Sequence, residues 1–218
     1  MFDKKKAAMP SLGKNSQTPF AEAYKALRTN LDFYAESEGV HTVLFVAPEA
    51  DPDKCTFIRN FALTLAAAGH SVLLADFDLR RGELTKSLQI AAEQTGVSDV
   101  LLGKAEADGA IVHGQLDNVD ILPSGAVCAD PAVLFTNKDA VGLLSGLCKQ
   151  YDFILMNTPC VDEYTDAVVL SRMVDSAVLL LNANTTHMPV AQKCKEKLET
   201  VQAKILGAVL TNYDSKKA

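Results

Sequence analysis

The stretch VLFVAPEADPDKCTF, at residues 43–57, carries side chains whose types and spacing could bind a phosphate group. An apolar run and a loop are followed by Lys54, Cys55 and Thr56, the place where a phosphate-binding loop has its lysine and its hydroxyl residues. Such a loop needs glycine, because it turns successive backbone N–H groups inward at positive φ and leaves no room for a Cβ atom. The positions where glycine is needed hold Asp51 and Asp53.

Both aspartates oppose anion binding. An aspartate held at positive φ costs on the order of 1–3 kcal/mol. A carboxylate within about 4 Å of a phosphate charge adds roughly 4 kcal/mol of repulsion at an effective dielectric constant near 20. Cys55 is a further defect, because a thiol is a soft ligand and Mg²⁺ prefers hard oxygen ligands. We therefore predict a loop that binds phosphate poorly, even with Lys54 in place.

Polar residues also follow two other apolar runs. Asp76 and Asp78 end the run SVLLADFD, and Asn157 ends the run DFILMN. In parallel sheets, ligands bind outside the carboxyl ends of the strands. The segments that we expect to meet in one crevice are residues 47–56, 76–81 and 157–160. In the absence of a metal, we expect Asp76 and Asp78 to pair with Arg80, Arg81 or Lys54, and we favour an ion pair of Lys54 with one of the two aspartates.

Apolar runs of strand length alternate with longer amphipathic segments, which is the pattern of a parallel sheet with crossover helices. Strands are expected at 41–47, 71–81, 119–125, 152–159, 176–184 and 204–212. Helices are expected at 18–37, 54–69, 83–90 and 98–103, from near 130, from about 163, and at 188–202. Nearly continuous apolar strands indicate a sheet that is covered on both faces. The predicted fold is therefore α/β: a doubly wound, mainly parallel central sheet with helices on both faces.

Composition favours a single globular domain at residues 18–214, between a basic segment at 1–17 and a short tail at 215–218. Apolar residues make up 48% and charged residues 22%, and no apolar run approaches the length of about 20 residues that a membrane span needs. The net charge of −6 argues against a nucleic-acid binder. The five scattered cysteines predict free thiols in a reducing cytoplasm and no metal centre.

The first 16 residues concentrate positive charge. The basic side chains there are Lys4, Lys5, Lys6 and Lys14. One interpretation is a solvated tail, and the other is a weak tether to anionic lipid or to an acidic partner.

Five segments occur in the order and spacing of the bacterial tyrosine kinases of capsule and exopolysaccharide synthesis. They are EAYKALRTNLDF, VLFVAPEADPDKCTFIRNFALTLAAAGHSVLLADFDLRR, LPSGAVCADPAVLF, YDFILMNTPCVDEYTDAVVLSRMVDSAVLLL and AKILGAVLTNYD. The chain resembles this family from about residue 19 to residue 214. The family consists of P-loop NTPases related to the Min and Par partitioning ATPases. The resemblance therefore implies a P-loop NTPase-like fold, with ATP and Mg²⁺ as the family's ligands and transfer of phosphate to tyrosine as its reaction.

The resemblance also implies roles for particular residues. The nucleotide-binding positions are Lys54, Cys55, Thr56 and, where related ATPases contact the edge of adenine, Asn212. The catalytic positions are Asp76 and Asp78 of the second-strand motif, which is intact. The positions that depart from the family pattern are Asp51, Asp53, Cys55 and Asn157, the last of which replaces an aspartate that supports the metal.

A second family feature concerns assembly. These kinases carry a Glu-x-x-Arg-x-x-Arg pattern on the first helix that joins subunits in a ring, and here it reads Glu22, Lys25 and Arg28. Residues at i, i+3 and i+6 share a broad helix face. That face is either a subunit contact or a solvated set of intrahelical ion pairs. The family's tyrosine-rich tail is reduced here to Tyr213.

Three functional hypotheses follow from the residues and the resemblance. The first is a pseudokinase adaptor without a bound cofactor, which acts in capsule, exopolysaccharide or cell-envelope assembly. It would be cytoplasmic and would dock on a membrane chain-length regulator at the inner face of the membrane. The second is an active tyrosine autokinase or ATPase that uses ATP and Mg²⁺ with Lys54, Asp76 and Asp78. The third is a Min/Par-like positioning protein with peripheral membrane association. In the first hypothesis, Asp51 and Asp53 could receive a cationic side chain from a partner.

Overall fold

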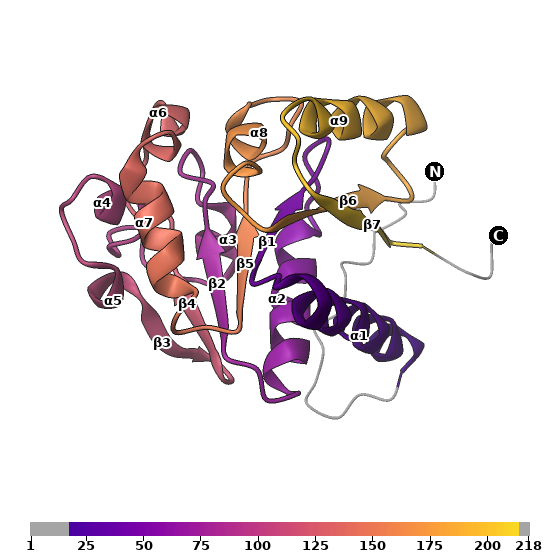
Figure 1. The fold of residues 1–218 in the computed structure, drawn as a ribbon, viewed down its shortest axis with the longest axis horizontal. Helices are drawn as coiled ribbons and strands as arrows, with labels where there is room; N and C mark the ends of the chain where they lie inside the picture. Colours follow the sequence, from indigo (N-terminus) through magenta and orange to yellow (C-terminus); the bar gives the residue numbers. More distant parts are fainter. Residues whose placement is uncertain (1–17, 214–218) are drawn as a thin grey trace, which may run out of the picture.

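A computed structural model describes residues 18–213, apart from the side chain of Lys138. The described chain forms a seven-stranded sheet in the order β3-β4-β2-β5-β1-β6-β7 (Figure 1). The strands are β1 (Thr42–Val46), β2 (Val72–Asp76), β3 (Val112–Leu116), β4 (Val119–Leu122), β5 (Phe153–Asn157), β6 (Ser176–Asn182) and β7 (Ile205–Thr211). Neighbouring strands run parallel except β3 and β4, which are antiparallel.

Helices precede and separate most of the strands along the chain. They are α1 (Pro19–Glu38), α2 (Lys54–Ala66), α3 (Glu83–Ser87), α4 (Val97–Leu101), α5 (Ala107–Ala110), α6 (Pro131–Phe135), α7 (Lys138–Leu147), α8 (Asp166–Leu170) and α9 (Met188–Thr200). The side chain of Thr18 accepts a hydrogen bond from Ala21 N, and Pro19 occupies the first turn, as the sequence predicts for this helix start.

Two separate cores lie on the two faces of the sheet. On one face, α1 and α2 contribute Tyr24, Leu31 and Phe61. On the other face, α7 and α9 contribute Leu144 and Leu198. The strands between them are buried along their whole length in β1, β2 and β5. The predicted doubly wound α/β fold is therefore confirmed.

The differences from the predicted elements lie at boundaries and at one edge of the sheet. The second helix ends at Ala66 and a further turn ends at Gly69, which has φ of 101°. Helix α8 begins at Asp166, where a start near 163 was expected. Strand β3 was not predicted, because its sequence VHGQL is mostly exposed at the sheet edge and lacks the apolar pattern of a buried strand.

Some expectations concern residues that the structure does not describe. The basic segment at 1–17, with its four lysines, and the tail at 215–218 lie outside the described residues. Within residues 18–213, no helix is both long enough and apolar enough to cross a membrane. The five cysteines are free thiols, as predicted.

Candidate functional site

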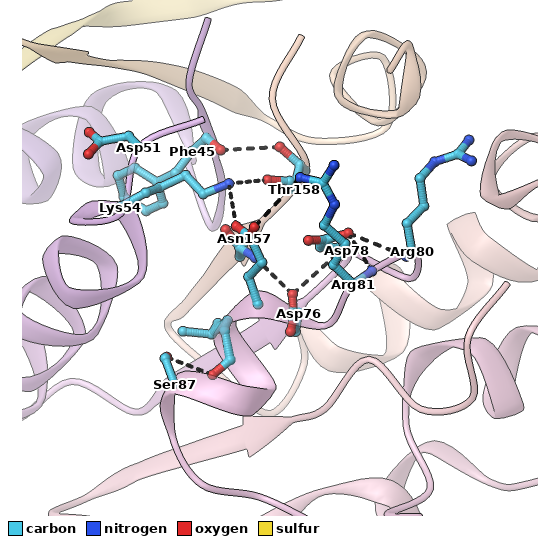
Figure 2. A network of polar contacts seen from close by, with 12 residues as sticks. Phe45, Asp51, Lys54, Asp76, Asp78, Arg80, Arg81, Ser87, Asn157 and Thr158 are labelled. Atoms are coloured by element: carbon cyan, nitrogen blue, oxygen red, sulfur yellow. Dashed lines mark hydrogen bonds and ion pairs between the residues drawn. The ribbon is translucent and has the colours of Figure 1, made fainter. Parts of the chain in front are cut away.

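The carboxyl ends of β1, β5 and β2 lie next to one another and form the predicted meeting point (Figure 2). In the strand register, Asn157 is level with Phe45 of β1 and with Asp76 of β2. Four polar side chains are buried here with at most 2% of their surface exposed: Lys54, Asp76, Asp78 and Asn157. The tertiary structure therefore brings the predicted lysine, aspartates and asparagine into one cluster.

Asp76 is the centre of this cluster. Its Oδ1 accepts hydrogen bonds from Asn157 Nδ2 at 2.8 Å and from Asp78 N at 3.2 Å. Its Oδ2 accepts from the backbone N and the hydroxyl of Thr85, at 2.8 and 2.7 Å. Burial raises the pKa of Asp76, the donors of Asn157 and Thr85 oppose that effect, and the nearby charge of Asp78 adds to it. Because both oxygens are occupied, Asp76 holds the strand ends together and offers no free coordination position.

Asn157 suits a site of this kind. Its side-chain nitrogen lies 2.8 Å from Asp76 Oδ1. An aspartate at position 157 would place a second carboxylate oxygen against Asp76, and two buried carboxylates at that separation repel strongly unless a cation or a proton lies between them. The amide replaces that repulsion with a hydrogen bond.

Lys54 does not form the predicted ion pair. Its Nζ donates a hydrogen bond to the backbone carbonyl of Thr158 and lies 4.0 Å from Glu83 Oε2. Among the described residues, no ion pair joins Lys54 to Asp76 or Asp78, which corrects the sequence expectation. For Asp76, the physical reason is that both carboxylate oxygens already have their donors. Glu83, in the first turn of α3, was not identified from the sequence.

Two buried acceptor atoms in the cluster have no hydrogen-bond partner in the described structure, Asp78 Oδ2 and Asn157 Oδ1. The other oxygen of Asp78 accepts from the backbone N of Arg80 and Arg81, at 3.3 and 3.1 Å. The free hydrogen-bonding capacity of the cluster is therefore that of acceptors. It suits water or a cationic group better than a phosphate oxygen.

The loop between β1 and α2 does not have the backbone conformation of a phosphate cradle. Asp53 has φ of −92° and ψ of −10°, and no residue of segment 47–53 has positive φ. The strain that we expected from aspartates at positive φ is thus absent, because the loop follows another path. Two of its backbone N–H groups are bonded within the loop, that of Asp53 to Asp51 Oδ1 and that of Lys54 to Asp51 O, whereas a phosphate cradle turns successive N–H groups toward the anion.

Side-chain hydrogen bonds tie this loop to the ends of β6 and β7. Asp51 Oδ1 accepts from Asp53 N at 3.0 Å and from Asn182 Nδ2 at 3.2 Å. Asp53 Oδ2 accepts from Asn212 Nδ2 at 2.6 Å. In Figure 2 the Asp51 carboxylate points away from the Lys54 ammonium group. The two aspartates therefore bind neutral amides across the sheet edge, one of them at the position predicted to contact adenine.

A cleft of about 440 Å³ opens beside these contacts. Its lining includes Glu49, Asp53, Asn182 and Asn212, and no lysine or arginine lines it within the described part of the chain. Carboxylates without a cation repel a phosphate. The charges that line the cleft therefore disfavour the binding of a nucleoside triphosphate.

Cys55 and Thr56 lie in the first turn of α2, directly after the loop. Burial raises the pKa of the Cys55 thiol to about 12, so it stays protonated at neutral pH. A neutral thiol is a poor ligand for Mg²⁺, which prefers hard oxygen ligands such as the hydroxyl found at this position of a phosphate-binding loop. The residues present therefore do not fit Mg·ATP.

A second cluster borders the site and was not predicted. Arg80 donates from Nε and Nη2 to the two carboxylate oxygens of Asp166, at 2.7 and 3.0 Å, and from Nη1 to Ala129 O at 2.9 Å. Its guanidinium lies 4.2 Å from the centre of the Tyr164 ring. Arg81 pairs with Glu163. The expected ion pairs of Arg80 and Arg81 with Asp76 or Asp78 are therefore wrong, although both arginines bond to Asp78 through their backbone. Asp166 was not identified from the sequence as the partner of Arg80, because only the fold brings the two residues together.

Comparisons with known proteins agree with the fold. A family model described as an AAA domain matches residues 52–207. Tyrosine-protein kinase YwqD of Bacillus subtilis is 30% identical over 190 residues, which cover 87% of this chain and 80% of that protein. The kinase domain of the Escherichia coli tyrosine kinase ETK superposes with a TM-score of 0.85 at 25% identity, over 98% of this chain and 86% of that one. The chain belongs to the bacterial tyrosine kinase family of capsule and exopolysaccharide synthesis.

The relation of this kinase family to partitioning ATPases is also confirmed. The septum site-determining protein MinD of Pyrococcus horikoshii, solved in complex with Mg-ADP, superposes with a TM-score of 0.67 at 27% identity. The match covers 80% of this chain and 71% of MinD. The predicted P-loop NTPase-like fold is therefore confirmed.

The kinase-family pattern on α1 lies on the surface. Lys25 Nζ is 2.7 Å from Glu22 Oε1, and Arg28 Nε is 3.8 Å from Asp32 Oδ2. These are intrahelical ion pairs between partly exposed side chains, which contribute little to stability. Oligomerisation through Glu22, Lys25 and Arg28 stays a prediction.

The buried thiol of Cys55 can be tested directly. With iodoacetamide at about pH 8, a thiol with a pKa of about 12 is ionised to roughly 1 part in 10⁴. We expect the half-buried Cys128 to be alkylated at least about 100-fold faster than Cys55, as measured by peptide mass spectrometry. In urea all five cysteines should react at similar rates. Rapid labelling of Cys55 in the folded protein would show that the loop opens.

Proposed function

We propose that this protein is a non-catalytic member of the bacterial tyrosine kinase family, a pseudokinase that acts as an adaptor in capsule or exopolysaccharide assembly. The observation that carries the proposal is the pair of cross-sheet contacts from Asp51 to Asn182 and from Asp53 to Asn212. The loop that binds phosphate in the family is bonded here to Asn212, at the position that contacts adenine in related ATPases, and to Asn182.

The state of the reactive groups supports the same proposal. Lys54 is held by the Thr158 carbonyl, and Cys55 is a neutral thiol. Asp76 has all its acceptor capacity filled by Asn157, Asp78 and Thr85. Phosphotransfer depends on positive charge and metal ions around the phosphates, because catalysis is almost entirely positioning and electrostatic stabilisation. This cluster supplies one positive charge, that of the buried Lys54, among several acidic groups.

We propose further that the adaptor docks on the cytoplasmic end of a membrane polysaccharide chain-length regulator and is held at the inner face of the membrane by that partner. Membership of the kinase family supports this assignment. Docking needs the folded surface and no phosphate chemistry, so it survives loss of the nucleotide site.

Replacing Lys54 distinguishes the adaptor hypothesis from the hypothesis of an active kinase. The substitution Lys54→Met keeps the length of the side chain. We expect its affinity for the cytoplasmic segment of the chain-length regulator from the same organism to be within about twofold of the affinity of the unmodified protein. Binding would be measured by biolayer interferometry, with the exposed Lys25→Met as the matched control. Phosphate incorporation from ATP into tyrosine should be absent in all three proteins. Incorporation that disappears in Lys54→Met would favour the active kinase.

A further inference from the structure

The edge strand β7 differs from most sheet edges in soluble proteins. It pairs with β6 along one side, and no other described strand pairs with it (Figure 1). Its sequence ILGAVLT has no charged residue and no proline, and Leu210 is 57% exposed. Exposed edges normally carry lysine, proline or another device that blocks pairing with a second chain. None is present along this strand.

An apolar groove of about 360 Å³ lies beside this edge, between α1 and β7. Its lining includes Leu27, Leu31 and Tyr34 from α1 and Leu206 and Val209 from β7. The groove also contacts Phe33 of α1, whose side chain is 64% exposed. A continuous apolar surface of this kind, next to unpaired backbone groups, is typical of a protein–protein contact.

We propose that β7 pairs in antiparallel orientation with β7 of a second copy of this chain, centred on Ala208, and joins two sheets into one. The chain carries a net charge of −6, so most surfaces of two copies repel each other. Strand β7 is uncharged, and centring on Ala208 sets Gly207 of one copy opposite Val209 of the other, within the regular part of the strand. The edge is thus complementary to itself in charge and in apolar character.

The symmetry of this arrangement brings the grooves of the two copies together. Antiparallel pairing of identical edge strands places the two-fold axis perpendicular to the sheet, so each face of one copy continues into the same face of the other. The two α1 helices then lie on one face with their grooves toward each other, and Phe33 of each copy can enter the joint groove. Strand pairing by itself buries less than the roughly 1,600 Å² of a typical stable interface, and the grooves supply additional apolar contact.

This contact is independent of the family's ring and of the proposed adaptor function. The ring pattern of Glu22, Lys25 and Arg28 lies in the first half of α1, where the groove has only Leu27, whereas its other α1 residues lie in the second half. No residue of the Lys54 cluster takes part. Failure of one proposal would leave the other intact.

Analytical ultracentrifugation of the full chain tests the proposal. We expect a reversible dimer, and we expect Leu210→Lys to raise its dissociation constant at least about 10-fold, because each ammonium group would be placed beside the apolar edge of the other copy and would lose water there. Val141→Lys is the matched control, since Val141 is 53% exposed on α7, away from β7, and should leave the constant unchanged. Thermal unfolding would verify that both variants fold.

A second variant defines the geometry. With Ala208→Cys, mild oxidation should give a disulfide-linked dimer, because identical residues at the two-fold of paired strands lie about 5 Å apart. The unmodified chain, with its five native cysteines, is the control for other crosslinks. A monomer at about 100 µM protein, a dimer that Leu210→Lys leaves unchanged, or no crosslink through position 208 would overturn the proposal.

Discussion

Titration of the protein with ATP or ADP, with or without Mg²⁺, is expected to give no detectable heat up to millimolar nucleotide. Asp51 and Asp53 bring two carboxylates to the loop that would have to receive the phosphates. One such charge at about 4 Å from a phosphate contributes roughly 4 kcal/mol of repulsion at an effective dielectric constant near 20. Each 1.4 kcal/mol is about a tenfold change in affinity. Isothermal titration calorimetry measures the effect directly.

Restoring the family's residues should recover binding. In the combined variant Asp51→Gly, Asp53→Gly, Cys55→Ser and Asn157→Asp, we expect Mg²⁺-dependent binding at least about 100-fold tighter than in the unmodified protein. The glycines remove two charges and permit positive φ, and the serine is a hard ligand. The new carboxylate at position 157, together with that of Asp76, would favour a cation between them. The matched control is Asp108→Asn, because the combined variant removes two carboxylates and adds one, and this single exposed substitution away from the cleft gives the same change in net charge.

Two results would contradict this account of the loop. Micromolar, Mg²⁺-dependent binding by the unmodified protein would mean that the aspartates move aside for phosphate, and a phosphotransfer assay would follow. Equal affinity of the restored and control variants would mean that net charge, and not the loop, limits binding.

Removal of the Arg80 side chain is expected to lower the free energy of unfolding by about 3 kcal/mol, the lower end of the range for breaking a buried ion pair. Arg80→Ala leaves the carboxylate of Asp166, which is 0% exposed, without either of its two guanidinium donors. It also removes the bond to Ala129 O and the contact with the Tyr164 ring. At roughly 2–4 °C per kcal/mol for a chain of this size, the midpoint of thermal unfolding should fall by about 6–12 °C.

The neighbouring arginine supplies the control. Arg81 has a 42% exposed side chain and pairs with the exposed Glu163, so Arg81→Ala should lower the free energy of unfolding by less than about 1 kcal/mol. Arg80→Lys should fall between the two alanine variants, because lysine keeps the charge and loses the planar fork. If Arg80→Ala and Arg81→Ala were equally stable in urea unfolding, the buried pair would have no special role.

The fold could be predicted because its signals are local. Continuous apolar runs between amphipathic segments indicated a parallel sheet, and Thr18 and Pro19 marked the start of α1 as observed. The adjacency of Lys54, Asp76 and Asn157 also followed, since parallel strands end at a common edge. Strand β3 escaped prediction because an exposed edge strand needs no apolar periodicity.

The pairings within the site could not be predicted. Lys54 was expected to pair with an aspartate and instead bonds to the Thr158 carbonyl, and Arg80 bonds to Asp166, which lies 86 residues away. Several acceptors compete for each donor in such a cluster, and the choice depends on differences of an ångström in strand and loop positions.

The sequence by itself determined the sheet, the family and the identity of the residues at its carboxyl edge. It also determined that glycine is missing where a phosphate cradle needs it, because that is a property of residue type. Only the tertiary structure decided what the aspartates do instead. Asp51 reaches Asn182 and Asp53 reaches Asn212 across 131 and 159 residues. Such contacts carry no local signal, since they exist only when the ends of β6 and β7 are folded against the loop.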